Sequence, residues 1–147
     1  MILEAFEKAF VELSKPEIEL LAEKSRDYIY QDGAKLMQEG EDHRQIMVII
    51  DGEVRVVVRK DEDGKETELT TPLTSGATVG EMSFVDHGGA SATLVAKGGV
   101  VVQAIDHELV QELANKDATF LQRFYHSLLI TVIQRLRLLD IKMSYMG

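Results

Sequence analysis

The chain of 147 residues is organised around residues 75–96, which read SGATVGEMSFVDHGGASATLVA. The stretch opens on a turn, passes through Gly80 and Glu81 into one short helical turn, crosses the pair Gly88–Gly89 and ends in an extended run, residues 92–96. A glycine turn that leads into a helix leaves several backbone N–H groups unpaired and pointing the same way. Such donors form a natural seat for a phosphate or carboxylate. We therefore predict an anion-binding site here.

Composition limits what such a site can serve. The chain has 25 acidic and 16 basic residues, a formal net charge of −9, which argues against nucleic acid as a partner because phosphate backbones need a basic face. There is no cysteine, so the chain has neither disulfides nor a thiolate metal site. Glu4 and Glu7 interrupt the apolar start, and no apolar run approaches the roughly 20 residues that span a bilayer. We expect a soluble, cytoplasmic protein with no membrane partner.

The middle of the chain has the pattern of short strands. From Tyr28 onward the apolar residues alternate with polar ones and glycines recur at short intervals, and residues 46–50 and 54–58 are β-branched or aliphatic runs. Strands at this spacing predict a small antiparallel β-barrel or jelly roll.

Three glycine dipeptides indicate where these strands end. Asp51–Gly52 and Asp63–Gly64 have the form of tight hairpins. Gly98–Gly99 is expected to turn the chain into the last strand, residues 100–105.

Helices are predicted on both sides of this region. Ser14 to Glu17 has the form of a capping box with proline early in the helix, which predicts a helix over residues 16–27. Asp106 stands where an N-cap belongs, before a short helix over residues 107–114. A long helix over residues 118–143 follows. The sequence thus predicts one domain: N-terminal helices in residues 1–27, a β-barrel in 28–105 and C-terminal helices in 106–147.

The long helix carries apolar residues on more than one side, which is typical of a helix that packs on its own domain and on a partner helix. The residues expected to form the contact of a homodimer are Leu121, Tyr125, Leu128, Val132 and Leu139. The alternative is a helix wholly buried against its own barrel.

Three segments together resemble the cyclic nucleotide-binding domain family. Residues 36–41, LMQEGE, resemble the family's strand ending in a Glu-Gly turn, and residues 47–54, MVIIDGEV, resemble its next strand, turn and strand. Residues 80–84, GEMSF, with residues 92–96, ATLVA, resemble the two halves of its phosphate-binding cassette. The match runs from about Phe10 to Leu139.

The resemblance implies a mainly β domain with flanking helices, with cAMP or cGMP as ligand and no further cofactor. In that family the glutamate at the position of Glu81 accepts a hydrogen bond from the ribose 2′-hydroxyl, backbone amides of the cassette help to hold the ligand, and the long helix caps the base. The ligand-binding residues implied here are Gly80, Glu81, Met82, Ser83, Ala90, Ser91, Ala92, Thr93, Thr131 and Arg135.

The cassette departs from the family at one position. Ala90 stands where the family has an arginine that pairs with the cyclic phosphate, and residues 76–96 contain no lysine or arginine. Three alternatives follow. The hydroxyls of Ser91 and Thr93 could hold the phosphate together with backbone amides. An arginine of the long helix, Arg123 or Arg135, could supply the charge. Or the domain has lost the nucleotide and works by its shape alone.

The same residues allow other interpretations. Glu81 could merely cap the short helix. The four histidines lack the spacing of a metal site, which argues against the metal-dependent cupin enzymes, and neither a nucleophile elbow nor a P-loop is present. We therefore expect no enzyme but a regulatory or sensor domain that signals through its C-terminal helix to an unknown effector protein. The alternative is a dimeric interaction module that binds no nucleotide.

Overall fold

The computed structural model describes residues 1–42, 44–59, 66–68 and 71–146, and for residues 59, 66, 82, 83 and 139–146 it describes the backbone alone. The helices are α1 (Ile2–Ala9), α2 (Lys15–Lys24), α3 (Glu81–Asp86), α4 (His107–Lys116) and α5 (Phe120–Met146). The strands are β1 (Arg26–Tyr30), β2 (Lys35–Met37), β3 (Ile46–Arg59), β4 (Glu66–Glu68), β5 (Thr78–Val79) and β6 (Thr93–Ile105). The predicted hairpin at Asp63–Gly64 lies outside the described residues.

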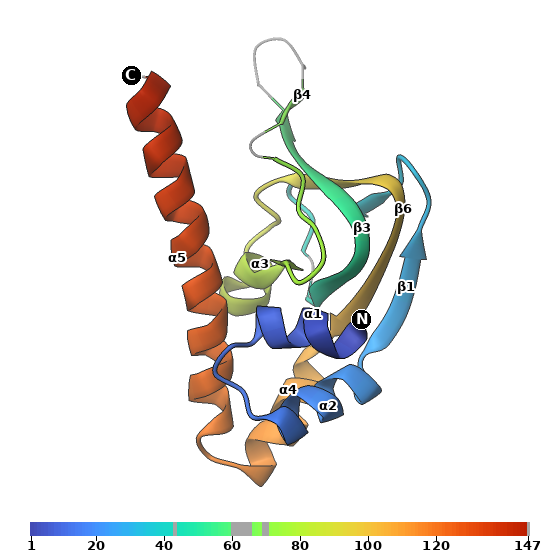
Figure 1. Ribbon diagram of the computed structural model, residues 1–147, viewed down its shortest axis with the longest axis vertical. Coiled ribbons are helices and arrows are strands. Elements are labelled where there is room, and N and C mark those ends of the chain that lie inside the picture. Colours follow the sequence, from blue (N-terminus) through green and yellow to red (C-terminus); the bar gives the residue numbers. More distant parts are fainter. Residues whose placement is uncertain (43, 60–65, 69–70, 147) are drawn as a thin grey trace.

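The six described strands form one antiparallel sheet. Its main order is β1-β6-β3-β4, while β2 pairs with β6 and β5 pairs with β3. In Figure 1 the sheet is strongly curled, and α1, α2 and α4 lie toward one end of it. Helix α5 runs along one side of the molecule, over most of its height. The predicted class, an antiparallel β-domain with flanking helices, is confirmed.

Two predicted turns are wrong, because the structure has long bent strands there. Strand β3 continues through Asp51 and Gly52, and β6 continues through Gly98–Gly99. The two strands remain paired across this region, with register shifts on both sides of Asp51. A Cβ added to Gly52 would lie 2.4 Å from the Gly99 carbonyl oxygen. The glycines therefore permit two bent strands to cross closely instead of ending them.

The helices begin where their caps place them. Helix α2 has the predicted capping box, in which the Glu17 amide donates to the Ser14 hydroxyl and the Ser14 amide donates to the Glu17 carboxylate. It ends at Lys24, three residues earlier than expected, because Arg26 pairs with Ala104 as the first residue of β1. Asp106 caps α4 through the Leu109 amide.

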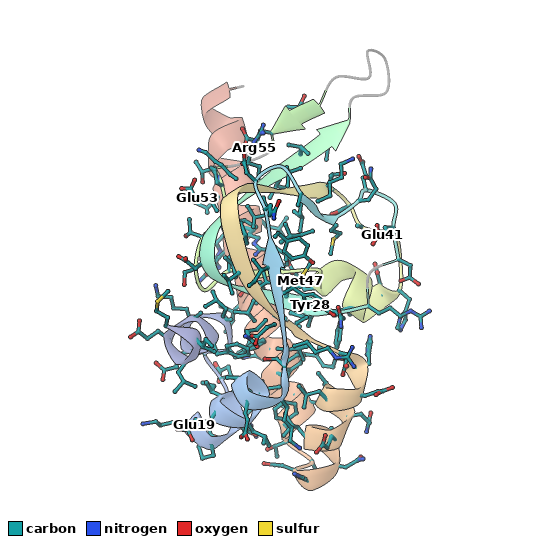
Figure 2. The ribbon with its side chains drawn as sticks, turned by 90° about the vertical axis from the view of Figure 1, so that its right-hand side faces the viewer. Glu19, Tyr28, Glu41, Met47, Glu53 and Arg55 are labelled. Carbon is teal, nitrogen blue, oxygen red and sulfur yellow. The ribbon has the colours of Figure 1, made fainter. Side chains whose placement is uncertain are left out.

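The apolar side chains form two clusters. One lies where α1, α2, α4 and α5 meet the base of the sheet and includes Phe10, Phe84 and Phe124. The Phe10 and Phe124 rings stack with centroids 5.2 Å apart. The other fills the barrel interior, where Figure 2 places Met47 between the strands. The first cluster thus fixes the beginning of α5 to the domain.

The predicted partner face of α5 needs a correction. Leu128 is 3% exposed within its own domain's core, and Leu121 packs against the same cluster, because the start of α5 covers α1 and α4. These two residues therefore belong to the monomer's core, whereas Tyr125 is exposed. The side chain of Leu139 lies outside the described part. Among the side chains of α5 that the structure describes, up to Leu138, the exposed large apolar ones are Tyr125, Leu129, Ile133, Leu136 and Leu138.

Candidate ligand-binding site

The candidate site lies at the start of α3, which follows β5 at one side of the barrel. Strand β5 is held by β3, with Thr78 opposite Val48 and Val79 opposite Met47. Gly80 follows, and Glu81 is the first residue of α3. Glu81 is 5% exposed. An ionisable side chain that is buried to this extent needs a partner.

The partner of Glu81 is Arg135, which lies 54 residues further along the chain on α5. Arg135 Nη1 forms an ion pair with Glu81 Oε1, and Arg135 Nη2 donates a hydrogen bond to the Thr78 carbonyl oxygen. The other carboxylate oxygen, Glu81 Oε2, is buried and has no hydrogen-bond partner. The guanidinium thus bridges two consecutive elements of the cassette, β5 and α3.

Helix α3 is also tied to α4 by stacked rings. Phe84 is fully buried and lies flat against His107, with centroids 3.8 Å apart and planes 2° apart. The His87 ring also stacks on His107, with centroids 5.6 Å apart. Burial, followed by the charges of His87 and Arg44, lowers the pKa of His107. The contact between α3 and α4 thus combines the stacked rings with a hydrogen bond between His107 and the Phe84 backbone, and His107 Nε2 is buried without a hydrogen-bond partner.

The second half of the cassette is bonded to the turn that follows β2. The Gly40 amide donates to the Ala90 carbonyl oxygen at 2.8 Å, and the Ala90 amide donates to the Glu41 carbonyl oxygen at 2.8 Å. The Glu39 amide donates to the Thr93 hydroxyl at 2.9 Å. A Cβ on Gly89 would lie 2.7 Å from the Gly40 carbonyl oxygen. One of the predicted phosphate contacts, the Thr93 hydroxyl oxygen, thus already accepts a hydrogen bond within the chain, and the backbone of Ala90 is paired on both sides.

Ala90 itself faces the barrel interior. It is 6% exposed and belongs to the apolar cluster inside the sheet, with Leu36, Met37 and Leu94. A longer side chain at this position would have to enter that cluster. The described cassette therefore provides no positive charge of its own.

The two arginines considered as substitutes differ in position. Arg135 reaches the cassette, as described above. Arg123 is bonded to Glu17 of α2 at 2.5 and 2.8 Å and to Asp117 at 3.3 Å, at the start of α5. Arg123 thus has carboxylate partners away from the cassette, and Arg135 is the arginine of the described α5 that contacts it.

The remaining predicted site residues have different surroundings and do not share one role. Thr131 donates its hydroxyl to the Ser127 carbonyl oxygen one turn earlier in α5, at 3.4 Å. Ser91 is exposed, and Ala92 is buried directly before β6. The backbones of Met82 and Ser83 lie in α3, and their side chains are outside the described part.

Sequence reasoning missed Thr78, whose carbonyl oxygen accepts from Arg135 and whose hydroxyl is buried without a hydrogen-bond partner. Every residue type has a backbone carbonyl oxygen, so the residue type could not predict this contact. The only sequence signal was the position of Thr78, two residues before Gly80.

Among the described residues no group of three or more His, Asp or Glu side chains has the arrangement of a metal site. Nor does the described part contain a helix with the length and apolarity to cross a membrane.

Comparison with known proteins identifies the class of this domain. The family model of the cyclic nucleotide-binding domain matches residues 29–117, more than half of the chain. The chain therefore belongs to the cyclic nucleotide-binding domain family, whose fold is that of regulatory domains. No curated protein sequence matches the chain significantly.

Solved structures share the fold over three quarters of this chain or more. A cyclic nucleotide-binding domain from Methylobacillus flagellatus is 20% identical with a TM-score of 0.84, covering 99% of this chain and 85% of that one. The Catabolite Activator Protein of Thermus thermophilus is 25% identical with a TM-score of 0.77, over 95% of this chain and 62% of that one. The cAMP-bound PfPKA-R is 27% identical with a TM-score of 0.67, over 76% of this chain and 39% of that one. The chain thus spans less than two thirds of the last two proteins.

Proposed function

We propose that this chain is a small regulatory domain that binds a cyclic nucleotide, cAMP or cGMP, or a related small anionic ligand, and signals through α5. The observation that carries the proposal is the position of Glu81. Its carboxylate is almost completely buried at the start of α3, retains one unpartnered oxygen and is bonded to the long helix. A residue that only capped a short helix would be expected in water.

The roles of the site residues follow from their chemistry. Glu81 accepts a hydrogen bond from a ribose hydroxyl, and the backbone amides of Gly80, Met82, Ser91 and Ala92 face the phosphate. With Ala90 in place of a cation, one charge-assisted hydrogen bond of about 1.5–3 kcal/mol is missing. Affinity is then roughly 10- to 150-fold weaker than with such a cation.

The second candidate function is a dimeric protein-interaction module without nucleotide. It is favoured by the exposed apolar residues in the second part of α5 and by the Ala90 amide, which already donates to the Glu41 carbonyl oxygen. In this alternative a homodimer would use Leu129, Ile133 and Leu136 with Tyr125 and Val132, and an effector protein would read the dimer. Size-exclusion chromatography with light scattering at several concentrations measures this association.

Calorimetric titration with cAMP and cGMP up to millimolar concentration separates the two candidates. We expect saturable heat for one nucleotide, and at least a tenfold loss of affinity in Glu81→Ala. Glu108→Ala is the matched control, because Glu108 is an exposed glutamate in the first turn of α4. Absence of heat and of any thermal shift at millimolar ligand would remove the nucleotide-binding function, as would unchanged affinity in Glu81→Ala.

The proposed role is regulatory, not catalytic, and it requires no cofactor. The proposed location is the cytoplasm, where cyclic nucleotides are present as second messengers.

A further inference from the structure

The second part of α5 is attached to the domain in a different way from the first. Phe120, Phe124 and Leu128 are buried in the core, and none of the side chains described at residues 129–138 is buried. Leu129 and Leu136 are both 53% exposed. Within residues 129–138, Arg135 is the side chain that bonds to another element, through Glu81 and the Thr78 carbonyl oxygen. In residues 129–138 the hydrogen bonds to the cassette thus come from one guanidinium.

This guanidinium occupies the place that a ligand hydroxyl needs. Arg135 is bonded to Glu81 Oε1, and the chain already covers Glu81 Oε2. A hydroxyl group can reach the carboxylate only when the groups above it move. Since Arg135 comes from α5, opening the carboxylate breaks the ion pair that attaches the second part of α5 to the cassette.

We propose that Arg135 is a built-in competitor of the ligand, a latch that closes α5 on the cassette when the site is empty. The ligand takes the carboxylate from the guanidinium and thereby frees residues 129–138. The coupling to ligand rests on the proposed function, whereas the latch itself does not. The exposed leucines of the freed segment are then available to an effector in a new orientation.

The competition has a defined effect on affinity. A ligand that binds only the open form loses apparent affinity by the fraction of molecules that are open. A closed contact worth one charge-assisted hydrogen bond keeps roughly nine molecules in ten closed. Removal of the guanidinium should therefore tighten ligand binding by roughly 10-fold. If Arg135 were instead a direct contact of the ligand phosphate, its removal would weaken binding.

The chain lends itself to a distance measurement, because it contains no cysteine. Spin labels can be placed at Ile29→Cys and Leu138→Cys, since these side chains are 78% and 67% exposed. Strand β1 and α5 lie on opposite sides of the molecule in Figure 1, so a swing of α5 changes the distance between the labels. Dilution with unlabelled chain removes distances between molecules.

The variants are Arg135→Gln and Glu81→Gln, which break the latch from either side, and the control is Arg137→Gln, an exposed arginine two residues further on. Without ligand, we expect one narrow distance distribution for the parent and for Arg137→Gln, and a broader or shifted one for both latch variants. Unchanged distributions in the latch variants, or an equal change in the control, would overturn the latch.

Calorimetry on the same proteins tests the coupling to ligand. Tighter cAMP or cGMP binding in Arg135→Gln than in the parent supports the latch, and weaker binding overturns it in favour of a phosphate contact. If neither protein binds nucleotide, the proposed function fails, while the distances without ligand still decide the latch.

Discussion

The ion pair between Glu17 and Arg123 should make the fold sensitive to acid. The carboxylate accepts two hydrogen bonds from the guanidinium, at 2.5 and 2.8 Å, and joins α2 to the start of α5. The hydrogen bonds from Arg123 lower the pKa of Glu17 from 4.5 to about 2, although burial alone would raise it. Because the folded protein holds the charged form more tightly than the unfolded chain does, the pair stabilises the fold above pH 4.5, and this contribution is lost as the pH falls toward about 2.

The magnitude follows from the shift and the exposure of the pair. One pKa unit corresponds to about 1.36 kcal/mol, so the full shift would be worth about 3 kcal/mol. The side chains of Arg123 and Glu17 are 28% and 16% exposed, so water screens part of this energy. We expect the pair to contribute about 1–2 kcal/mol.

Glu17→Gln isolates this contribution, because glutamine keeps the shape and can still take part in the capping box. Urea unfolding followed by circular dichroism should show Glu17→Gln less stable than the parent by about 1–2 kcal/mol at pH 7, with the gap closing between pH 4.5 and pH 2.5. The matched control is Glu19→Gln, since Glu19 lies on the outer face of α2 (Figure 2). A gap of the same size at every pH, or an equal loss in the control, would refute the reasoning.

Three further changes test the packing and the cassette. Phe124→Ala should lower the free energy of unfolding by about 3–5 kcal/mol in urea titrations, because the ring is fully buried between Phe10 and Phe84; a loss under about 1 kcal/mol would contradict this packing. Gly89→Ala should lower the melting temperature, because its Cβ would stand 2.7 Å from the Gly40 carbonyl oxygen, and an unchanged melting temperature would show that the loop can move away. Ala90→Arg should lower the melting temperature without ligand, because Ala90 lies in the apolar interior. If a phosphate binds here and neutralises the new charge, cAMP or cGMP should restore the melting temperature. A melting temperature that stays low with nucleotide would argue against a phosphate at this place.

Local signals in the sequence predicted local structure well. The capping box at Ser14 and the N-cap at Asp106 gave the starts of α2 and α4 because each depends on neighbouring backbone groups. The strand pattern gave the antiparallel class. The turns predicted at Gly52 and Gly99 are wrong because glycine permits both a turn and a close crossing of two strands. Only the pairing of β3 with β6 distinguishes these outcomes.

The site was predictable in position but not in its connections. The run from Gly80 to Glu81 marked the start of α3, as the structure has it. The bridge from Arg135 to Glu81 joins residues 54 apart in sequence, and no periodicity specifies that contact. The burial of Leu128 in its own domain was not predicted, for a related reason. Apolar spacing alone does not tell which stripe of a helix meets its own core, and Leu128 does so.

The most direct test of this account is an amide NMR titration of the isotope-labelled chain with cAMP and with cGMP. The account predicts that the shifts which change with nucleotide concentrate in residues 78–93 and in residues 129–138 of α5, while residues 120–128 change little. Shifts that stay constant at millimolar nucleotide, or changes confined to the surroundings of Arg123, would contradict it.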